Sequence, residues 1–164
     1  MMKRSMRWPL AAALLCALGT GHAADTLKDC ALEKLDGSGK LDLAKQPGKL
    51  VYVDFWASWC GPCKQSFPFM NQLKKQFEAK GVSVVAISVD KDPKDAVEFL
   101  KDHPADFTVA SDPASKCAKA AAVKGMPTSY IVGKDGTILY THKGFRPADM
   151  EEITKQLQLM SEKQ

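Results

Sequence analysis

The sequence predicts an α/β protein with a mixed central sheet, helices on both faces of that sheet and a β-hairpin at the N-terminus. The runs at 49–56 and 82–90 are apolar almost throughout, which is typical of strands buried on both faces. Segments with helical spacing of apolar residues follow both runs. A Lys-Asp-Gly turn at 134–136 then joins two late strands as a hairpin. The predicted order is hairpin, βα, βα, βα, ββ, α.

The first 23 residues are predicted to be a cleaved secretory signal peptide. Basic residues precede an apolar run at 10–18, which is too short to span a bilayer as a helix, and a cleavage site follows Ala23. Lipid attachment at Cys16 is the alternative, but Leu15 is bulky where that processing favours a small side chain.

Residues 24–164 are expected to form a single domain with its own core. The formal net charge of the whole chain is +4, and the leader carries three basic residues and no acidic ones. No basic block therefore remains to bind nucleic acid. We also expect no stable membrane insertion of the mature chain.

The predicted elements follow in order. A Gly-rich turn within KLDGSGKLDL, residues 34–43, indicates the first hairpin, and the strand over 49–56 comes next. Apolar residues recur at helical spacing from Phe67 to Phe77, until Gly81 ends the run. The strand over 82–90 follows.

Two later helices are predicted to begin where an Asp able to cap precedes a Pro suited to the first helical position. These pairs are Asp92-Pro93 and Asp112-Pro113, with a short strand at 107–111 between them. The strands of the late hairpin lie at 127–132 and 137–142. A last helix has Met150, Ile153 and Leu157 on one face.

Two cysteines, Cys60 and Cys63, lie where the strand over 49–56 gives way to a helix. Pro62 between them suits the first helical turn, so Cys60 is expected at the helix N-terminus. Unpaired backbone N–H groups and the helix dipole favour an anionic sulfur there, and the thiolate is the attacking species. Cys63, one turn further in, is expected to be more buried and suited to resolving.

Asp54 places an ionisable carboxyl inside the apolar strand that ends beside this pair. Burial should raise the pKa of this carboxyl, which could then accept a proton from Cys63 as that thiol attacks. The alternative is a structural carboxylate at a strand end, paired with Lys64 or Lys74.

These residues carry a family resemblance. VDFWASWCGPCK closely resembles the active-site segment of thioredoxins. GMPTSYIV at 125–132 resembles a second thioredoxin motif, in which a cis-proline is followed by Thr and an apolar strand. With its leading hairpin and an extra αβ unit at 94–111, the chain after the leader resembles the exported TlpA/ResA-like branch of the thioredoxin superfamily. The resemblance implies a thioredoxin fold in which Cys60 is the nucleophile, Cys63 the resolving thiol and Asp54 the proton acceptor.

The resemblance also implies a substrate-binding surface around the pair. Pro127 would follow a cis peptide bond, and Met126 would offer backbone hydrogen bonds to an extended substrate segment, as in strand addition. The side of the site next to the cysteines would be framed by Trp56, Trp59, Gly61 and Pro62.

Two departures from the exported branch bring the site closer to an ordinary thioredoxin. Ser66 stands where that branch usually has Glu, and Asp54 where it often has Asn. The Gly61-Pro62 dipeptide is also thioredoxin-like, and thioredoxin's potential of about −270 mV is far more reducing than the roughly −120 mV of DsbA. We therefore predict a periplasmic reductant of protein disulfides, acting by dithiol exchange.

Its expected partners are disulfide-containing exported proteins and a membrane thiol reductant of the DsbD type, which the resemblance implies. No cofactor is expected beyond the redox-active disulfide Cys60–Cys63, and no metal. A disulfide oxidant or isomerase remains an alternative, because the redox potential depends on how each redox form is stabilised locally.

Cys30 and Cys117 complete the four cysteines that remain after the leader. An even number in an exported protein suggests disulfides, but four cysteines allow three full pairings. Our hypothesis is a structural Cys30–Cys117 bridge that ties the first hairpin to the body. Two independent buried thiols are the alternative.

Several other functions fit the sequence less well. A thiol peroxidase of this fold would have Thr and Pro where this chain has Ala57 and Val53. A four-cysteine zinc site lacks the second close pair of common structural sites. His103 and His142 fit ordinary polar positions better than copper ligands, and a binding module without redox turnover would usually lack one active-site cysteine.

Overall fold

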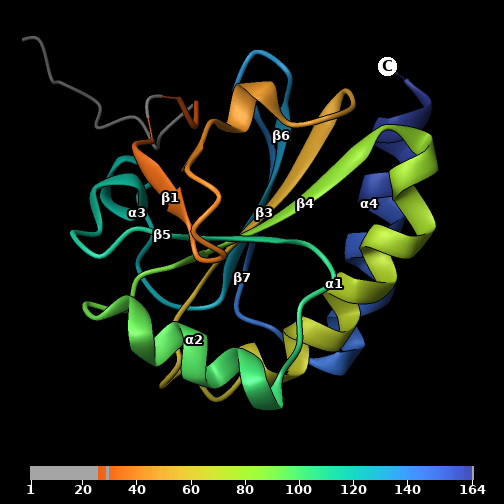
Figure 1. Cartoon of the computed structure of the whole chain (residues 1–164). Helices are drawn as coiled ribbons and strands as arrows, with labels where there is room; N and C mark the ends of the chain where they lie inside the picture. The colour runs from red at the N-terminus through yellow and green to blue at the C-terminus, as the bar shows by residue number, and fades with distance from the viewer. Residues whose placement is uncertain (1–25, 29, 164) are drawn as a thin grey trace, which may run out of the picture.

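A seven-stranded mixed sheet organises the protein in the computed structural model, which describes residues 26–28 and 30–163 (Figure 1). The strand order is β2-β1-β5-β4-β3-β6-β7. The strands are β1 (Leu32–Lys34), β2 (Lys40–Leu41), β3 (Leu50–Trp56), β4 (Val82–Ser88), β5 (Thr108–Ser111), β6 (Thr128–Gly133) and β7 (Ile138–Lys143). The central strands β3, β4 and β5 are parallel, and the outer pairs are antiparallel. This confirms the predicted mixed sheet.

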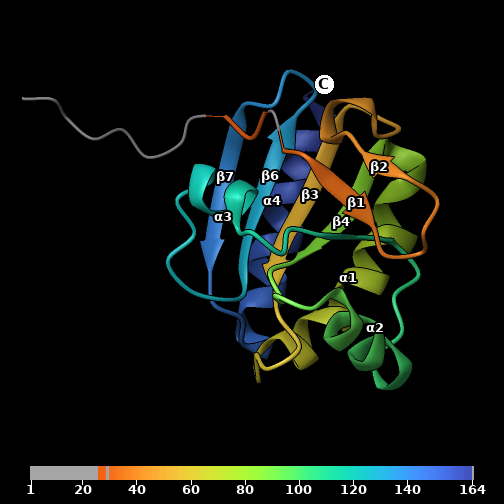
Figure 2. The ribbon, with the colours of Figure 1, turned by 60° about the vertical axis from the view of Figure 1, so that its left-hand side comes forward.

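Four α-helices and three short 3-10 helices connect the strands. They are α1 (Cys63–Phe77), α2 (Pro93–Asp102), α3 (Lys116–Ala120), α4 (Met150–Glu162), η1 (Leu43–Lys45), η2 (Glu78–Lys80) and η3 (Pro147–Asp149). Figure 2 shows α3 and α4 on opposite sides of the sheet, so helices cover both faces. Among the residues described, no helix combines the length and apolar character needed to cross a bilayer.

The two faces of β3 build two separate cores, because successive side chains of a strand point to opposite faces. On one face Trp56 packs against Phe67 of α1 and Phe99 of α2, with ring centroids 4.7 Å apart in both pairs. On the other face Phe55 belongs to a cluster that includes Cys117 of α3 and the apolar residues of the first hairpin. All seven residues of β3 are buried, as the continuous apolar run predicts.

Most predicted helix boundaries agree with the structure, but the start of α3 does not. Asp92 caps α2 as predicted, accepting a hydrogen bond from the Lys94 N–H at 3.0 Å. The helix expected from Asp112-Pro113 begins instead at Lys116, because Ser115 adopts a left-handed φ of 51°. A turn closed by the Ser115 N–H on the Asp112 carbonyl comes first, and the Asp112 carboxylate then accepts hydrogen bonds from Lys116 and Ala118 of α3, so the predicted start was too early.

The leader predictions fall outside the described residues. They are the signal peptide over 1–23, its cleavage site after Ala23 and the alternative lipidation of Cys16. All three stay predictions from the sequence.

Candidate redox site

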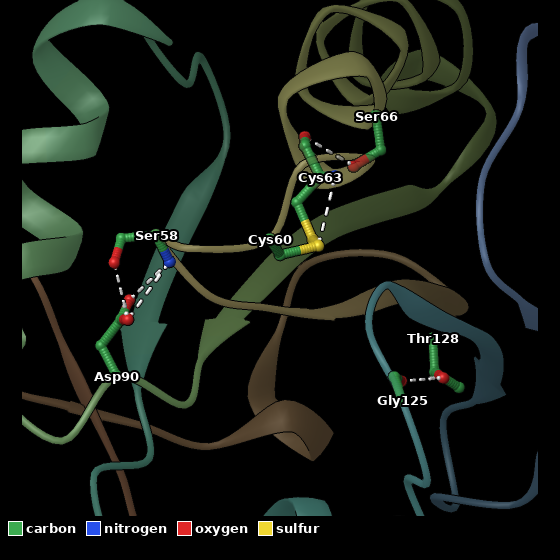
Figure 3. The surroundings of a disulfide bond; sticks show 7 residues. All are labelled: Ser58, Cys60, Cys63, Ser66, Asp90, Gly125 and Thr128. Atoms are coloured by element: carbon green, nitrogen blue, oxygen red, sulfur yellow. Dashed lines mark hydrogen bonds between the residues drawn. A yellow bond between two sulfur atoms is a disulfide. The ribbon is translucent and has the colours of Figure 1, made fainter.

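Cys60 and Cys63 lie at the carboxyl end of β3 and form a disulfide, with the sulfurs 2.02 Å apart (Figure 3). Cys63 is the first residue of α1, and its backbone N–H donates to Cys60 Sγ at 3.3 Å. That contact is the predicted interaction between a helix N-terminus and the Cys60 sulfur. The structure therefore represents the oxidised form of the pair.

Exposure differs between the two cysteines and their neighbours. Cys63 is fully buried, Cys60 is 4% exposed, and the side chain of Trp59 is 68% exposed. Gly61 and Pro62 are exposed as well. Cys60 is therefore the more accessible of the two cysteines, and its role as the attacking thiol stays a prediction.

Asp54 lies in the middle of β3 and is 1% exposed. Its Oδ1 has no hydrogen-bond partner within the described structure, and burial raises the pKa of this carboxyl well above its usual range. Strand alternation places Asp54 on the same face as Tyr52 and Trp56, which belong to the core cluster that contains Cys63. Asp54 and Cys63 thus share one core.

The structural alternative for Asp54 is not found in the residues described. Lys74 pairs with Glu78 on the surface of α1, at 3.4 Å, and no ion pair of Asp54 occurs in this part of the chain. The pKa of the Tyr52 hydroxyl is raised by burial and, to a smaller extent, by the neighbouring Asp54 carboxyl. The carboxyl is therefore buried with little protein polarity to stabilise its charge.

The segment just before β6 also lies beside the redox pair. The Met126–Pro127 peptide bond is cis, as the resemblance implied, and Met126 is partly exposed. The Thr128 hydroxyl donates to the Gly125 carbonyl at 2.7 Å and closes the turn. Figure 3 shows this turn on one side of the disulfide and Ser58 with Asp90 on the other.

Asp90 is a site residue that the sequence analysis missed. It follows β4, is 2% exposed, and accepts hydrogen bonds from the backbone N–H and the hydroxyl of Ser58, at 3.0 and 2.8 Å (Figure 3). Ser58 lies two residues before Cys60. The signal that could have found Asp90 was a second carboxyl in an apolar strand segment, here at the end of the predicted strand over 82–90.

Comparison with known proteins identifies the family. The family model described as Redoxin matches residues 22–157. The chain belongs to the Redoxin family.

Individual members of this fold and family agree with that assignment. The thiol-disulfide oxidoreductase ResA of Bacillus thuringiensis subsp. konkukian is 33% identical over 119 residues, which cover 72% of this chain and 69% of the relative. ResA of Bacillus subtilis is 32% identical over 105 residues, covering 63% and 59%. A Chlorobium tepidum protein of known structure, assigned as the thiol:disulfide interchange protein DsbE, is 46% identical with a TM-score of 0.77, covering 85% of this chain and 97% of that one.

Family membership and the site together confirm the predicted chemical class. The protein is a thiol–disulfide oxidoreductase of the ResA and DsbE type within the Redoxin family, and Cys60 and Cys63 are its C-x-x-C pair. The individual roles of Asp54, Trp59, Met126 and the other predicted site residues stay predictions.

A second disulfide lies outside the redox site. Cys30, before β1, is bonded to Cys117 on α3, with the sulfurs 2.03 Å apart and the Cα atoms 5.1 Å apart. Cys117 is buried and Cys30 is half-buried. Of the three pairings open to the sequence, the structure has the one that ties the segment before the first hairpin to the body.

Proposed function

We propose that the protein is an exported reductant of protein disulfides, which works in the periplasm by dithiol exchange. The observation that carries this proposal is the buried, unpartnered carboxyl of Asp54 in the same core as the fully buried Cys63. A resolving thiol shielded from water needs an internal proton acceptor, and Asp54 provides one.

The proposed cycle has two exchange steps. In the reduced enzyme, the Cys60 thiolate attacks one sulfur of a substrate disulfide, forms a mixed disulfide and releases the other substrate sulfur as a thiolate. Cys63 then attacks Cys60 Sγ while its proton passes to Asp54, and the remaining substrate thiolate leaves. Two electrons have moved from the cysteine pair to the substrate.

Substrates would be disulfide-containing exported proteins that lie against the wall formed by Met126 and Pro127. Met126 is partly exposed, which supports docking by strand addition, and the exposed Trp59 offers a further apolar contact. A membrane thiol reductant of the DsbD type would return the electrons. The predicted leader and the second disulfide support an oxidising compartment, where disulfides persist.

The net direction can be tested by redox titration of the leader-free chain in thiol–disulfide buffers. Quenched alkylation with mass detection would count each cysteine separately. We expect a Cys60–Cys63 potential near thioredoxin's value of about −270 mV, with Cys30 and Cys117 protected throughout. A potential near the roughly −120 mV of DsbA would overturn the reductant role and make the protein an oxidant or isomerase.

The roles within the cycle can be tested by trapping. Cys63→Ser should accumulate the mixed disulfide with a protein substrate, because the second step needs the Cys63 sulfur. Asp54→Asn should slow the second step more than the first, and Asp42→Asn, an exposed change of the same kind, should slow neither. Equal slowing of both steps by Asp54→Asn would contradict the proton role.

No observation favours the peroxidase alternative. The residues at the positions where such enzymes would have Thr and Pro are Ala57 and Val53, and both are fully buried apolar side chains. Neither offers a hydrogen-bond donor to a peroxide oxygen.

A further inference from the structure

Two buried carboxylates besides Asp54 lie near the ends of the parallel strands. Asp90 follows β4 and is 2% exposed, and Asp112 follows β5 and is 3% exposed. Unlike Asp54, both are surrounded by hydrogen-bond donors that the structure identifies. Buried carboxylates with a full set of donors hold the donors in place, because a donor left without its partner is costly.

Asp90 holds the loop that leads into the redox pair. The Ser58 N–H lies 3.0 and 3.2 Å from the two Asp90 oxygens, and the Ser58 hydroxyl donates at 2.8 Å (Figure 3). The Ser88 hydroxyl donates to Asp90 Oδ2 at 2.8 Å from the strand itself. One carboxylate thus joins the end of β4 to the residue two positions before Cys60.

The same network continues away from the redox pair. The Asp112 N–H donates to the Ser88 carbonyl at 2.7 Å. The Asp112 carboxylate in turn accepts from the N–H groups of Lys116 and Ala118, both at 2.9 Å, in α3. Cys117 lies between these two residues and carries the disulfide to Cys30. An unbroken series of contacts therefore runs from the second disulfide to Ser58.

We propose that Asp90 is a positioning residue for thiol–disulfide exchange, and that Ser88 and Asp112 connect the loop it holds to the Cys30–Cys117 disulfide. The inference rests on the proposed exchange between Cys60 and Cys63, but not on its net direction. The second step is intramolecular, so its rate depends on how closely the backbone holds the two sulfurs together. A loosened loop lets Cys60 move away from Cys63.

The two exchange steps can be separated with dithiobis(nitrobenzoate) as the probe. The reduced pair releases one coloured thiolate when Cys60 attacks, and a second when Cys63 attacks the mixed disulfide and loses its proton. The first phase depends on the probe concentration and the second does not. Cys30 and Cys117 are bonded to each other and do not contribute.

Asp90→Asn is the decisive variant, because it keeps one acceptor oxygen but places a donor NH₂ at the other oxygen position, so it cannot serve both the Ser58 and the Ser88 hydroxyl as Asp90 does. We expect the second phase to slow at least roughly fivefold while the first stays within about twofold. The equilibrium constant for closing the pair against glutathione should fall at least about threefold, or about 14 mV at 29.6 mV per factor of ten. Asp42→Asn, an exposed cap of η1, should behave like the wild type.

A second variant keeps the test valid if Asp90→Asn does not fold. Ser58→Ala retains the carboxylate and removes only the hydroxyl donor, and it should slow the second phase in the same direction by a smaller factor. A purely stabilising role would lower the urea midpoint and leave the second phase at its wild-type rate, which would overturn the proposal. A changed first phase with an unchanged second phase would indicate a charge effect and would also overturn it.

The connection to the second disulfide can be tested with the double variant Cys30→Ser/Cys117→Ser. We expect the second phase to slow, and the effect to be non-additive with Asp90→Asn in a double-mutant cycle, because both changes loosen one network. Strictly additive effects, or no effect, would overturn the connection to the second disulfide. An oxidant-like potential in the wild type would refute the proposed reductant role, yet the variant-to-wild-type ratios would still test the positioning.

Discussion

Replacing Asp54 by Asn should stabilise the oxidised protein at neutral pH. Burial raises the pKa of Asp54 well above the value of 3.8 that the side chain has when exposed. Between those two pKa values the folded state binds a proton that the unfolded state has released. Stability therefore falls as the pH rises through this window and is constant above the folded pKa. Asn cannot ionise, so the variant does not lose stability in this way as the pH rises.

The size of the effect follows from the linkage between proton binding and unfolding. One proton difference changes the free energy of unfolding by about 1.4 kcal/mol per pH unit. Near pH 3.8, where Asp54 is still protonated in the folded state, the amide and the neutral carboxyl have nearly the same shape, so the two proteins should be about equally stable. The stability difference should then grow at this slope until it reaches a plateau, and the pH at the plateau gives the folded pKa.

Urea unfolding of the two oxidised proteins at a series of pH values would measure this difference. Trp56 is fully buried and provides a fluorescence signal for loss of the core. Asp42→Asn serves as the control, because hydrogen bonds and a lysine lower the pKa of this exposed carboxyl. Its contribution has the opposite sign, since the stability it adds is lost as the pH falls. Parallel curves for Asp54→Asn and the wild type would refute the idea that Asp54 is buried and poorly stabilised as an anion.

Three further predictions test the fold. Gly48→Ala should destabilise by more than about 1 kcal/mol in urea unfolding, because φ is 89° and the new Cβ would clash with the backbone carbonyl oxygen of Gly81. Gly37→Ala has a similar φ but open space around it and should cost less. Phe67→Ala removes a fully buried ring from the α1 core and should cost about 3–5 kcal/mol, and a loss under about 1 kcal/mol would contradict that packing. Replacing both Cys30 and Cys117 by Ser, which opens a loop with a sequence separation of 87, should cost about 4–5 kcal/mol in the chain-entropy description, measured on the oxidised form.

The sequence predicted the elements whose signals are local. The continuous apolar run of β3, the cap of α2 and the turn before β7 each depend on neighbouring residues, and all three agree with the structure. The position of the redox pair also followed, because a strand that ends at two cysteines and a proline leaves few arrangements for them.

The features that the sequence could not supply depend on distant partners. Asp90 and Ser58 are 32 positions apart, so no spacing rule joins them. The late start of α3 was also missed, because the Asp112 carboxylate accepts from the N–H groups of Lys116 and Ala118, further along the chain than the local Asp-Pro signal indicates. The pairing of Cys30 with Cys117 was one of several until the position of α3 was known.

The three buried aspartates show why burial alone does not define a role. Asp90 and Asp112 accept hydrogen bonds from backbone N–H groups, so their carboxylates act by holding the chain in place. Asp54 leaves one oxygen without a partner, so a proton can bind there without breaking a structural contact. The same lack of partners makes the Asp54 anion costly to the fold. A variant that gains stability and loses the second exchange step would therefore demonstrate both consequences of one unsatisfied carboxyl.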